Sequence, residues 1–146
     1  MSKWVLLLGG STGHGAATAK KLASEGYGII AFHFDRGEAK KVANETIEEV
    51  KHLSNKRCHY FNINAASEKT IDEYIPKIKE ITNGESLKLL LHSIAFGTTT
   101  NFFGDKPVTQ RQMDMTVHVM GNSLLYWTQN LYAEGLLSNG SRVIGL

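Results

Sequence analysis

The sequence predicts an α/β fold in which five parallel strands and four helices form a doubly wound sheet. Short apolar segments of strand length alternate along the 146 residues with longer segments whose apolar residues recur at helical spacing. The first apolar segment ends in a run of glycines, and a helical segment follows it directly. A composition of 42% hydrophobic and 21% charged residues suits one compact domain over 1–146.

The first two strand and helix pairs are expected in the first third of the chain. Residues 4–8 are all apolar, as in a strand that is buried on both faces of a parallel sheet. A helix over 16–24 follows, with three alanines on one face and Gly26 as its stop signal. Residues 28–34 are rich in isoleucine and phenylalanine and should form the second strand. Residues 39–53 then repeat apolar positions at helical spacing.

The third pair consists of a strand over 59–63 and a helix that Ser67 can cap. Pro76 lies inside this helix and is expected to kink or interrupt it, because proline lacks the N–H of a helical hydrogen bond. The residues expected to form its buried face are Ile71, Tyr74, Ile75, Ile78 and Ile81.

The fourth strand, 87–94, is the most apolar run and should be central in the sheet. A loop rich in Gly, Thr and Asn leads to Thr109, which matches a capping box together with Gln112. A long helix over 110–137 and a last strand over 142–146 complete the pattern. The residues expected to face inward from the long helix are Met113, Val117, Met120, Leu124 and Leu131.

The turn between the first strand and the first helix is the candidate binding site. Gly9, Gly13 and Gly15 have the spacing G-x-x-x-G-x-G. Backbone N–H groups and the helix dipole can hold a pyrophosphate at such a turn, so the sequence predicts a dinucleotide there. Ala16 after Gly15 argues against the phosphate loop of kinases and ATPases, which needs a lysine. The alternative is a tight turn without a binding role.

The glycine turn, the alanine-rich helix after it and the run 89–96 together resemble the short-chain dehydrogenase/reductase family over the whole chain. This resemblance implies a Rossmann-like domain and a reductase that uses a nicotinamide cofactor. The sequence His92-Ser93-Ile94-Ala95 stands where the family usually has Asn-Asn-Ala-Gly. It resembles the branch that contains enoyl-acyl-carrier-protein reductases, which implies reduction of an enoyl thioester. The glycine turn is similar to the main branch, so a carbonyl (ketone) reductase is the alternative within the family.

The resemblance also implies which residues contact the cofactor. The residues implied around the pyrophosphate are Gly9, Ser11, Thr12, Gly13, His14 and Gly15. Asn62 and Ile63 would flank the adenine. The residues implied along the nicotinamide ribose are Ser93, Ile94 and Ala95.

Coenzyme choice is expected to depend on the end of the second strand. A carboxylate there binds the ribose 2′-hydroxyl of NAD, whereas a cation binds the 2′-phosphate of NADP. The usual acidic position of the family falls on His33, and Arg36 and Lys40 follow, which favours NADP. Asp35 keeps NAD as the alternative.

Catalysis in this family resembles proton donation by a tyrosine that is followed four residues later by a lysine. None of the five tyrosines of this chain has that lysine, and in the family the pair comes after the fifth strand. We therefore expect no catalytic residue within 1–146 and a C-terminally incomplete domain of a longer protein. A dinucleotide-binding module without catalysis is the rival hypothesis. His118 takes the place of an asparagine that supports a proton path in the family.

Composition limits the partners and the location. A net charge of +2, with basic and acidic residues interspersed, argues against nucleic acid, and no apolar run has the length of a membrane span. The single cysteine, Cys58, suits a cytoplasmic protein, and no Cys/His pair has metal-ligand spacing, so no metal site is expected. The expected partners are a small-molecule or acyl-thioester substrate, with acyl carrier protein in the enoyl case. The long helix resembles the subunit interface helix of the family, so a homo-oligomer is expected.

Overall fold

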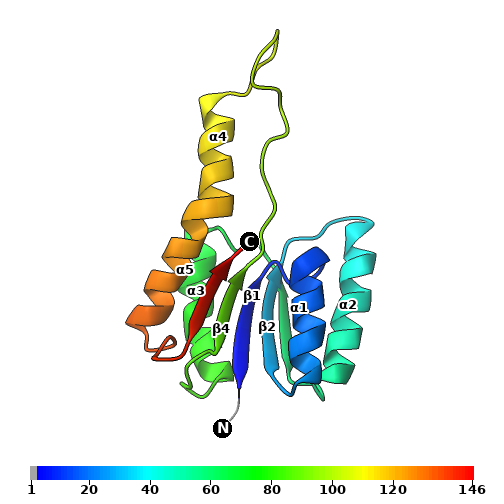
Figure 1. Ribbon diagram of the computed structural model, residues 1–146, viewed down its shortest axis with the longest axis vertical. Helices are drawn as coiled ribbons and strands as arrows, with labels where there is room; N and C mark the ends of the chain where they lie inside the picture. The colour runs from blue at the N-terminus through cyan, green and yellow to red at the C-terminus, as the bar shows by residue number, and fades with distance from the viewer. Residues whose placement is uncertain (1–2) are drawn as a thin grey trace.

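The computed structural model describes residues 3–146, and its strands form one parallel sheet. The strands are β1 (Trp4–Leu8), β2 (Gly28–His33), β3 (Cys58–Asn62), β4 (Leu89–His92) and β5 (Arg142–Gly145). The first three helices are α1 (Gly13–Ser24), α2 (Ala39–Leu53) and α3 (Glu68–Ile81). A fourth, continuous helical stretch consists of α4 (Gln110–Val117), the π-helical turn η1 (His118–Asn122) and α5 (Ser123–Ala133). The predicted fold class is therefore confirmed (Figure 1).

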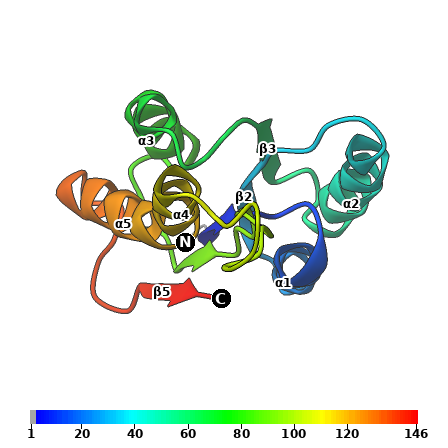
Figure 2. The same cartoon turned by 90° about the horizontal axis from the view of Figure 1, so that it is seen from above.

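The order of the strands, β3-β2-β1-β4-β5, reverses at β1. The chain first builds the sheet from β1 toward β3 and then returns to place β4 on the other side of β1. Leu6 of β1 accordingly pairs with Ile30 of β2 on one side and with Leu90 of β4 on the other. In such sheets a crevice opens at the carboxyl ends of the two strands where the order reverses. Figure 2 views the molecule from this end.

Both faces of the sheet are covered by helices, which explains why β1 is apolar throughout. Leu6 and Leu8 belong to the core on the side of α3 and α5, whereas Val5 and Leu7 belong to the core on the side of α1 and α2. Successive side chains of a strand point to opposite faces, so a strand between two helical layers needs apolar residues at every position. Figure 2 shows the two helical layers on opposite sides of the sheet.

The start of α1 packs directly on the turn that precedes it. A Cβ on Gly15 would overlap the carbonyl oxygen of Gly9 and lie 3.3 Å from the Cα of Gly10. Only glycine leaves room for this contact between backbone and backbone. As a result α1 begins at Gly13, three residues before the predicted start, and its first turn lies against the end of β1.

Several other boundaries differ from the predictions. β4 covers only the middle of the predicted strand over 87–94, and α3 continues through Pro76 without a break. Pro76 lies on the exposed face of α3, where water can bind the carbonyl that loses its helical partner. Ser67 precedes α3 at the N-cap position, but its side chain accepts no capping hydrogen bond. The predicted capping box of Thr109 and Gln112 is confirmed.

The predicted packing of the long helix is wrong in its first half. Met113, Val117 and Met120 are 37%, 51% and 43% exposed instead of inward-facing. The reason is that α4 extends beyond the carboxyl edge of the sheet, so that no strand lies beneath it (Figure 1). The wider turn of η1 then changes which residues face the core. From η1 to the end of α5 the buried residues are Val119, Ser123, Trp127 and Leu131, while Leu124 is partly buried.

A buried hydrogen-bond network joins β4 to the fourth helical stretch. The Nε2 atom of His92 lies 2.7 Å from the Ser123 hydroxyl, which donates to the Val119 carbonyl at 2.8 Å. His92 is 1% exposed and Ser123 is fully buried. Because the single hydroxyl proton goes to the carbonyl, we assign the donor to Nε2–H of His92. The network thus fixes η1 against the end of β4.

The substitution Gly15→Ala is expected to lower the free energy of unfolding by about 1–3 kcal/mol, because the added Cβ overlaps buried backbone. Gly121→Ala is the matched control, since a Cβ at Gly121 meets nothing within 4 Å. Urea unfolding checks both variants. Equal stability of Gly15→Ala and the control would contradict the contact.

The buried His92 predicts a pH dependence of stability. Burial lowers the pKa of His92 in the folded protein, whereas histidine in the unfolded chain titrates near pH ~6.5. The unfolded state therefore binds the proton first, and stability is lost as the pH falls through about 6.5 toward the folded pKa. We expect the urea midpoint to fall between about pH 7 and about pH 5, and His92→Gln to reduce that slope. An unchanged slope in His92→Gln contradicts the assignment.

Candidate functional site

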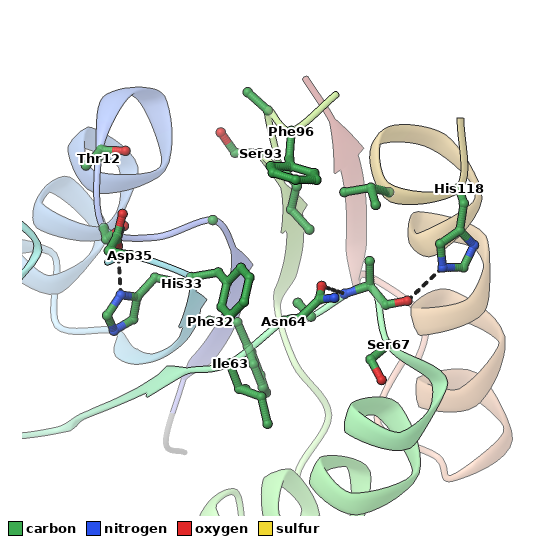
Figure 3. A pocket seen from close by; sticks show the side chains of 18 of the residues that line it. Thr12, Phe32, His33, Asp35, Ile63, Asn64, Ser67, Ser93, Phe96 and His118 are labelled. Atoms are coloured by element: carbon green, nitrogen blue, oxygen red, sulfur yellow. Dashed lines mark hydrogen bonds and ion pairs between the residues drawn. The ribbon is translucent and has the colours of Figure 1, made fainter. Parts of the chain in front are cut away.

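A cavity of about 420 Å³ lies at the carboxyl ends of the strands. Its walls come from the glycine turn, the end of β2, the loops after β3 and β4, and the segment from α4 into η1. Figure 3 shows Thr12, His33 and Asp35 on one side, with Asn64, Ser67 and His118 on the other. The volume is in the usual range of ligand cavities, and its position matches the crevice that the strand order predicts.

The structure brings most of the predicted binding residues to this cavity. Those that line it are Gly9, Ser11, Thr12, His33, Ile63, Ser93, Ile94 and Ala95. The predicted residues outside the lining are Gly13, His14, Gly15, Arg36 and Asn62. The first three of these form the start of α1 beside the cavity, Arg36 follows the end of β2, and Asn62 is the last residue of β3.

The glycine turn has the geometry of an anion cradle. The N–H groups of Gly9 and Gly10 both donate to the Phe32 carbonyl, at 2.9 and 3.0 Å, which ties the turn to β2. Gly9 and Gly13 have φ values of 92° and 54°, a region that favours glycine. A Cβ on Gly13 would meet nothing within 4 Å, and the first turn of α1 contains no acidic residue. The free N–H groups and positive end of α1 therefore face open space, which fits a phosphate.

The glycine turn also approaches the end of β4 closely. A Cβ on Gly9 would overlap the Ser93 carbonyl oxygen, and the Ser93 N–H donates to the Leu8 carbonyl at 2.7 Å. This contact places the predicted pyrophosphate site and the predicted nicotinamide ribose site next to each other. The two segments are more than 80 residues apart in the sequence, and only the pairing of β1 with β4 brings them together.

Asp35 lies in the cavity wall at the end of β2. Its Oδ2 atom accepts a hydrogen bond from the Ser11 hydroxyl at 2.6 Å and lies 2.8 Å from Nδ1 of His33. The side-chain amide of Asn62 bonds the backbone of Asp35 in both directions, at 3.1 and 3.0 Å. Asn62 therefore holds the segment after β2 in place, and its predicted contact with adenine stays a prediction.

Arg36 is exposed at the rim of the cavity. Its guanidinium carbon lies 4.7 Å from the centroid of the Phe34 ring, and Phe34 itself lines the cavity. Stacking of this kind orients a guanidinium while leaving its N–H groups free to bind an anion. The sequence indicated Arg36 but not Phe34, because a lone aromatic residue at a strand end carries no specific signal.

Tyr60 supports the glycine turn from β3. Its hydroxyl donates to the Gly10 carbonyl at 3.3 Å, and its ring meets the His33 ring edge-on with 6.1 Å between centroids. Burial raises the pKa of Tyr60 far above its usual value, so the phenol stays protonated and acts as a donor. Tyr60 is therefore a brace for the turn.

The loop after β3 forms the opposite wall and is held by the fourth helical stretch. Trp127 donates from Nε1 to the Ala65 carbonyl at 2.7 Å, and His118 donates from Nε2 to the Ala66 carbonyl at 2.9 Å. Asn64 accepts from the Ala66 N–H at 3.0 Å. His118 thus uses one ring nitrogen to position this wall, while its side chain lines the cavity. The sequence indicated His118 but not the two alanines it helps to place.

Four further lining residues that the sequence did not indicate are apolar. They are Phe32, Phe96, Met115 and Val119. They lie in β2, in the loop after β4 and on the stretch from α4 into η1, and they resemble ordinary core or loop sequence, so no local pattern marks them. Their side chains make part of the lining suitable for an apolar ligand group.

No group of three or more His, Cys, Asp or Glu side chains within residues 3–146 could hold a metal ion. In the same range, the helices are too short or too polar to span a bilayer.

Comparison with solved structures shows the same fold in several reductases. A short-chain dehydrogenase/reductase from Serratia marcescens has 21% identity and a TM-score of 0.75, with 98% of this chain and 54% of that chain covered. YwfH, an NADPH-dependent reductase involved in bacilysin biosynthesis, has 16% identity, a TM-score of 0.78 and coverages of 99% and 58%. A 3-oxoacyl-[acyl-carrier protein] reductase from Brucella melitensis has 20% identity and a TM-score of 0.74, with 95% of this chain and 52% of that chain covered. This chain spans just over half the length of these structures.

No curated protein matches the chain. The family model for short chain dehydrogenases matches residues 3–144, which is nearly the whole sequence. The match includes the glycine turn, every residue that lines the cavity, β1 to β4 and most of β5. The chain therefore belongs to the short-chain dehydrogenase family of oxidoreductases.

Proposed function

We propose that the cavity at the carboxyl edge of the sheet binds a nicotinamide dinucleotide and that the protein is a reductase. The observation that carries the proposal is the convergence, on one cavity, of the glycine turn with the N-cap residue of α1, Thr12, and the segments at the ends of β2 and β4. When bound, the nicotinamide supplies a hydride to the substrate. The residues of this chain bind and orient the cofactor.

The pyrophosphate contacts proposed here follow from the space above Gly13. Thr12 and the first N–H groups of α1 border that space, and no acidic side chain of the first helical turn opposes an anion. The nicotinamide ribose would lie along Ser93 and Ile94, which the turn approaches at Gly9. Ile63, on the opposite wall, would border the adenine.

The coenzyme we propose is NADP(H). Arg36 is exposed beside the end of β2 and stacks on Phe34, so its guanidinium is available to a 2′-phosphate at the rim of the cavity. Asp35 supports NAD as the alternative, since a carboxylate can bind a ribose hydroxyl.

The substrate we propose is an enoyl thioester, with hydride going to its β-carbon and a proton completing the reduction. The support is the sequence His92-Ser93-Ile94-Ala95 at the end of β4 and the apolar wall beside it, which includes Phe96. A carbonyl reductase is the second candidate, favoured by the glycine turn. We also propose that the protein is cytoplasmic, that it forms a homo-oligomer, and that acyl carrier protein delivers its substrates.

Arg36→Gln is expected to weaken NADPH binding about tenfold and NADH binding by less than about twofold, because only NADPH carries the 2′-phosphate. Fluorescence titration of the purified protein measures both dissociation constants. Arg142→Gln, at the start of β5 and therefore at the other end of the strands, is the matched control. Equal weakening of both coenzymes by Arg36→Gln would contradict its role, and no binding of either coenzyme would refute the proposed function.

An assay of the protein at its natural full length separates the proposed reactions, because residues 1–146 contain no Tyr-x-x-x-Lys pair. We expect NADPH to be consumed with crotonyl thioesters and not with simple ketones. Turnover of ketones alone would establish the carbonyl reductase instead. Tight NADPH binding without turnover of either substrate would support a binding module.

A further inference from the structure

The carboxylate of Asp35 is held by donors from two segments of the chain. Ser11, in the glycine turn, donates to Oδ2 at 2.6 Å, and His33, in β2, lies 2.8 Å from the same atom. A carboxylate only accepts hydrogen bonds, so Nδ1 of His33 carries the shared proton. The side chains of His33 and Asp35 are 5% and 16% exposed. Such charge-assisted bonds are strong where little water competes for them.

The backbone of Asp35 is fixed as well. Asn62 accepts from its N–H at 3.1 Å and donates to its carbonyl at 3.0 Å. Neither the peptide group nor the carboxylate can move toward a ligand without losing hydrogen bonds. The next residue, Arg36, is exposed and contacts the Phe34 ring. One end of β2 thus carries a fixed, hydrogen-bonded carboxylate followed by an accessible cation.

We propose that Ser11, Asp35 and His33, together called the Ser-Asp-His clamp, determine coenzyme choice by holding the carboxylate away from the ribose. The proposal rests on the dinucleotide site proposed above. The two donors occupy Oδ2, which reduces its capacity to accept from a ribose hydroxyl. Their O–H and N–H dipoles also weaken the negative potential that would otherwise oppose a 2′-phosphate. Arg36 is then left as the charged group that faces the ribose.

Loss of one donor should reverse this preference. The carboxylate would gain freedom to rotate toward the ribose, and one donor fewer would stabilise its charge. NADH would then bind more tightly and NADPH more weakly. The quantity that reports the clamp is the ratio of the NADPH to the NADH dissociation constant, because general damage to the site changes both constants alike.

His33→Phe is the main variant. It keeps an aromatic ring beside Tyr60, whose ring centroid lies 6.1 Å from that of His33, and removes the donor. We expect the ratio to rise about tenfold. Ser11→Ala removes the other donor and should also raise the ratio. Loss of a polar group near the pyrophosphate can weaken the binding of both coenzymes, but that effect does not change their ratio. Ser11→Ala changes only one hydroxyl, so it serves as the test should His33→Phe not fold.

Asp35→Asn and Glu38→Gln complete the experiment. Asp35→Asn removes the charge, so the ratio should fall while NADH binding stays within about twofold of the original. Glu38→Gln is the matched control, because Glu38 is an exposed carboxylate near Arg36 in sequence that pairs with Lys41 at 2.9 Å. In this control the ratio of the NADPH to the NADH dissociation constant should stay within about twofold of the value for the unmodified protein.

The outcomes separate the clamp from the proposed function. If His33→Phe and Ser11→Ala weaken both coenzymes equally, the clamp is only a structural support and the proposal is wrong. If Asp35→Asn weakens NADH about tenfold, the carboxylate itself binds the ribose and the proposal is also wrong. If the unmodified protein binds neither coenzyme, the dinucleotide site fails and the clamp fails with it.

Discussion

The cavity depends on a backbone contact that excludes side chains. Gly15 lies against the carbonyl of Gly9, and Gly9 in turn lies against the carbonyl of Ser93. These contacts set the distance of α1 and β4 from the end of β1, the central strand. Because β1 is buried on both faces, it cannot shift to relieve an added side chain. The open space beside the start of α1 follows from this arrangement.

The walls of the cavity are joined by side-chain hydrogen bonds between distant segments. Ser11 reaches the segment after β2, and Trp127 reaches the loop after β3. In each of these bonds the acceptor lies outside the helices and strands. Backbone groups there have no partners in regular secondary structure, so other groups must supply their hydrogen bonds. The loops therefore keep a defined position without long elements of their own. A cofactor would meet a largely preformed site, which reduces the entropy lost on binding.

α4 obtains its stability from its ends and from the loop beside it. It has no buried residue, so its position depends on the continuous helical stretch that follows it and on the contacts of its own polar side chains. Its capping box satisfies backbone groups at its start, and the side chain of Thr116 accepts from the Thr98 N–H at 3.0 Å. The exposed Met113, Val117 and Met120 leave apolar surface on this helix and on η1. That surface is compatible with the homo-oligomer proposed for this protein.

The local pattern of the sequence determined the elements of this protein. Runs such as 4–8 and 28–34 predict strands between helical layers, because burial on both faces requires apolar residues throughout. The glycine spacing predicted the turn, since Gly9 and Gly13 need positive φ. The local sequence could not predict the roles of residues that depend on a partner far away in the chain. Asp35 was visible as a carboxylate, but its bond to Ser11 exists only when the turn meets the end of β2.

The errors in the predicted packing of the long helix also arise because burial depends on distant parts of the chain. Periodicity shows which residues of a helix share a face, but not whether a sheet lies beneath that face. Met113 and Val117 share the apolar spacing of a buried helix, yet α4 extends past the strands and η1 alters the register. Local propensity and spacing thus determined the elements and the turn. The tertiary structure alone decided which helical face is buried and which polar groups meet, because both depend on contacts between residues far apart in the chain.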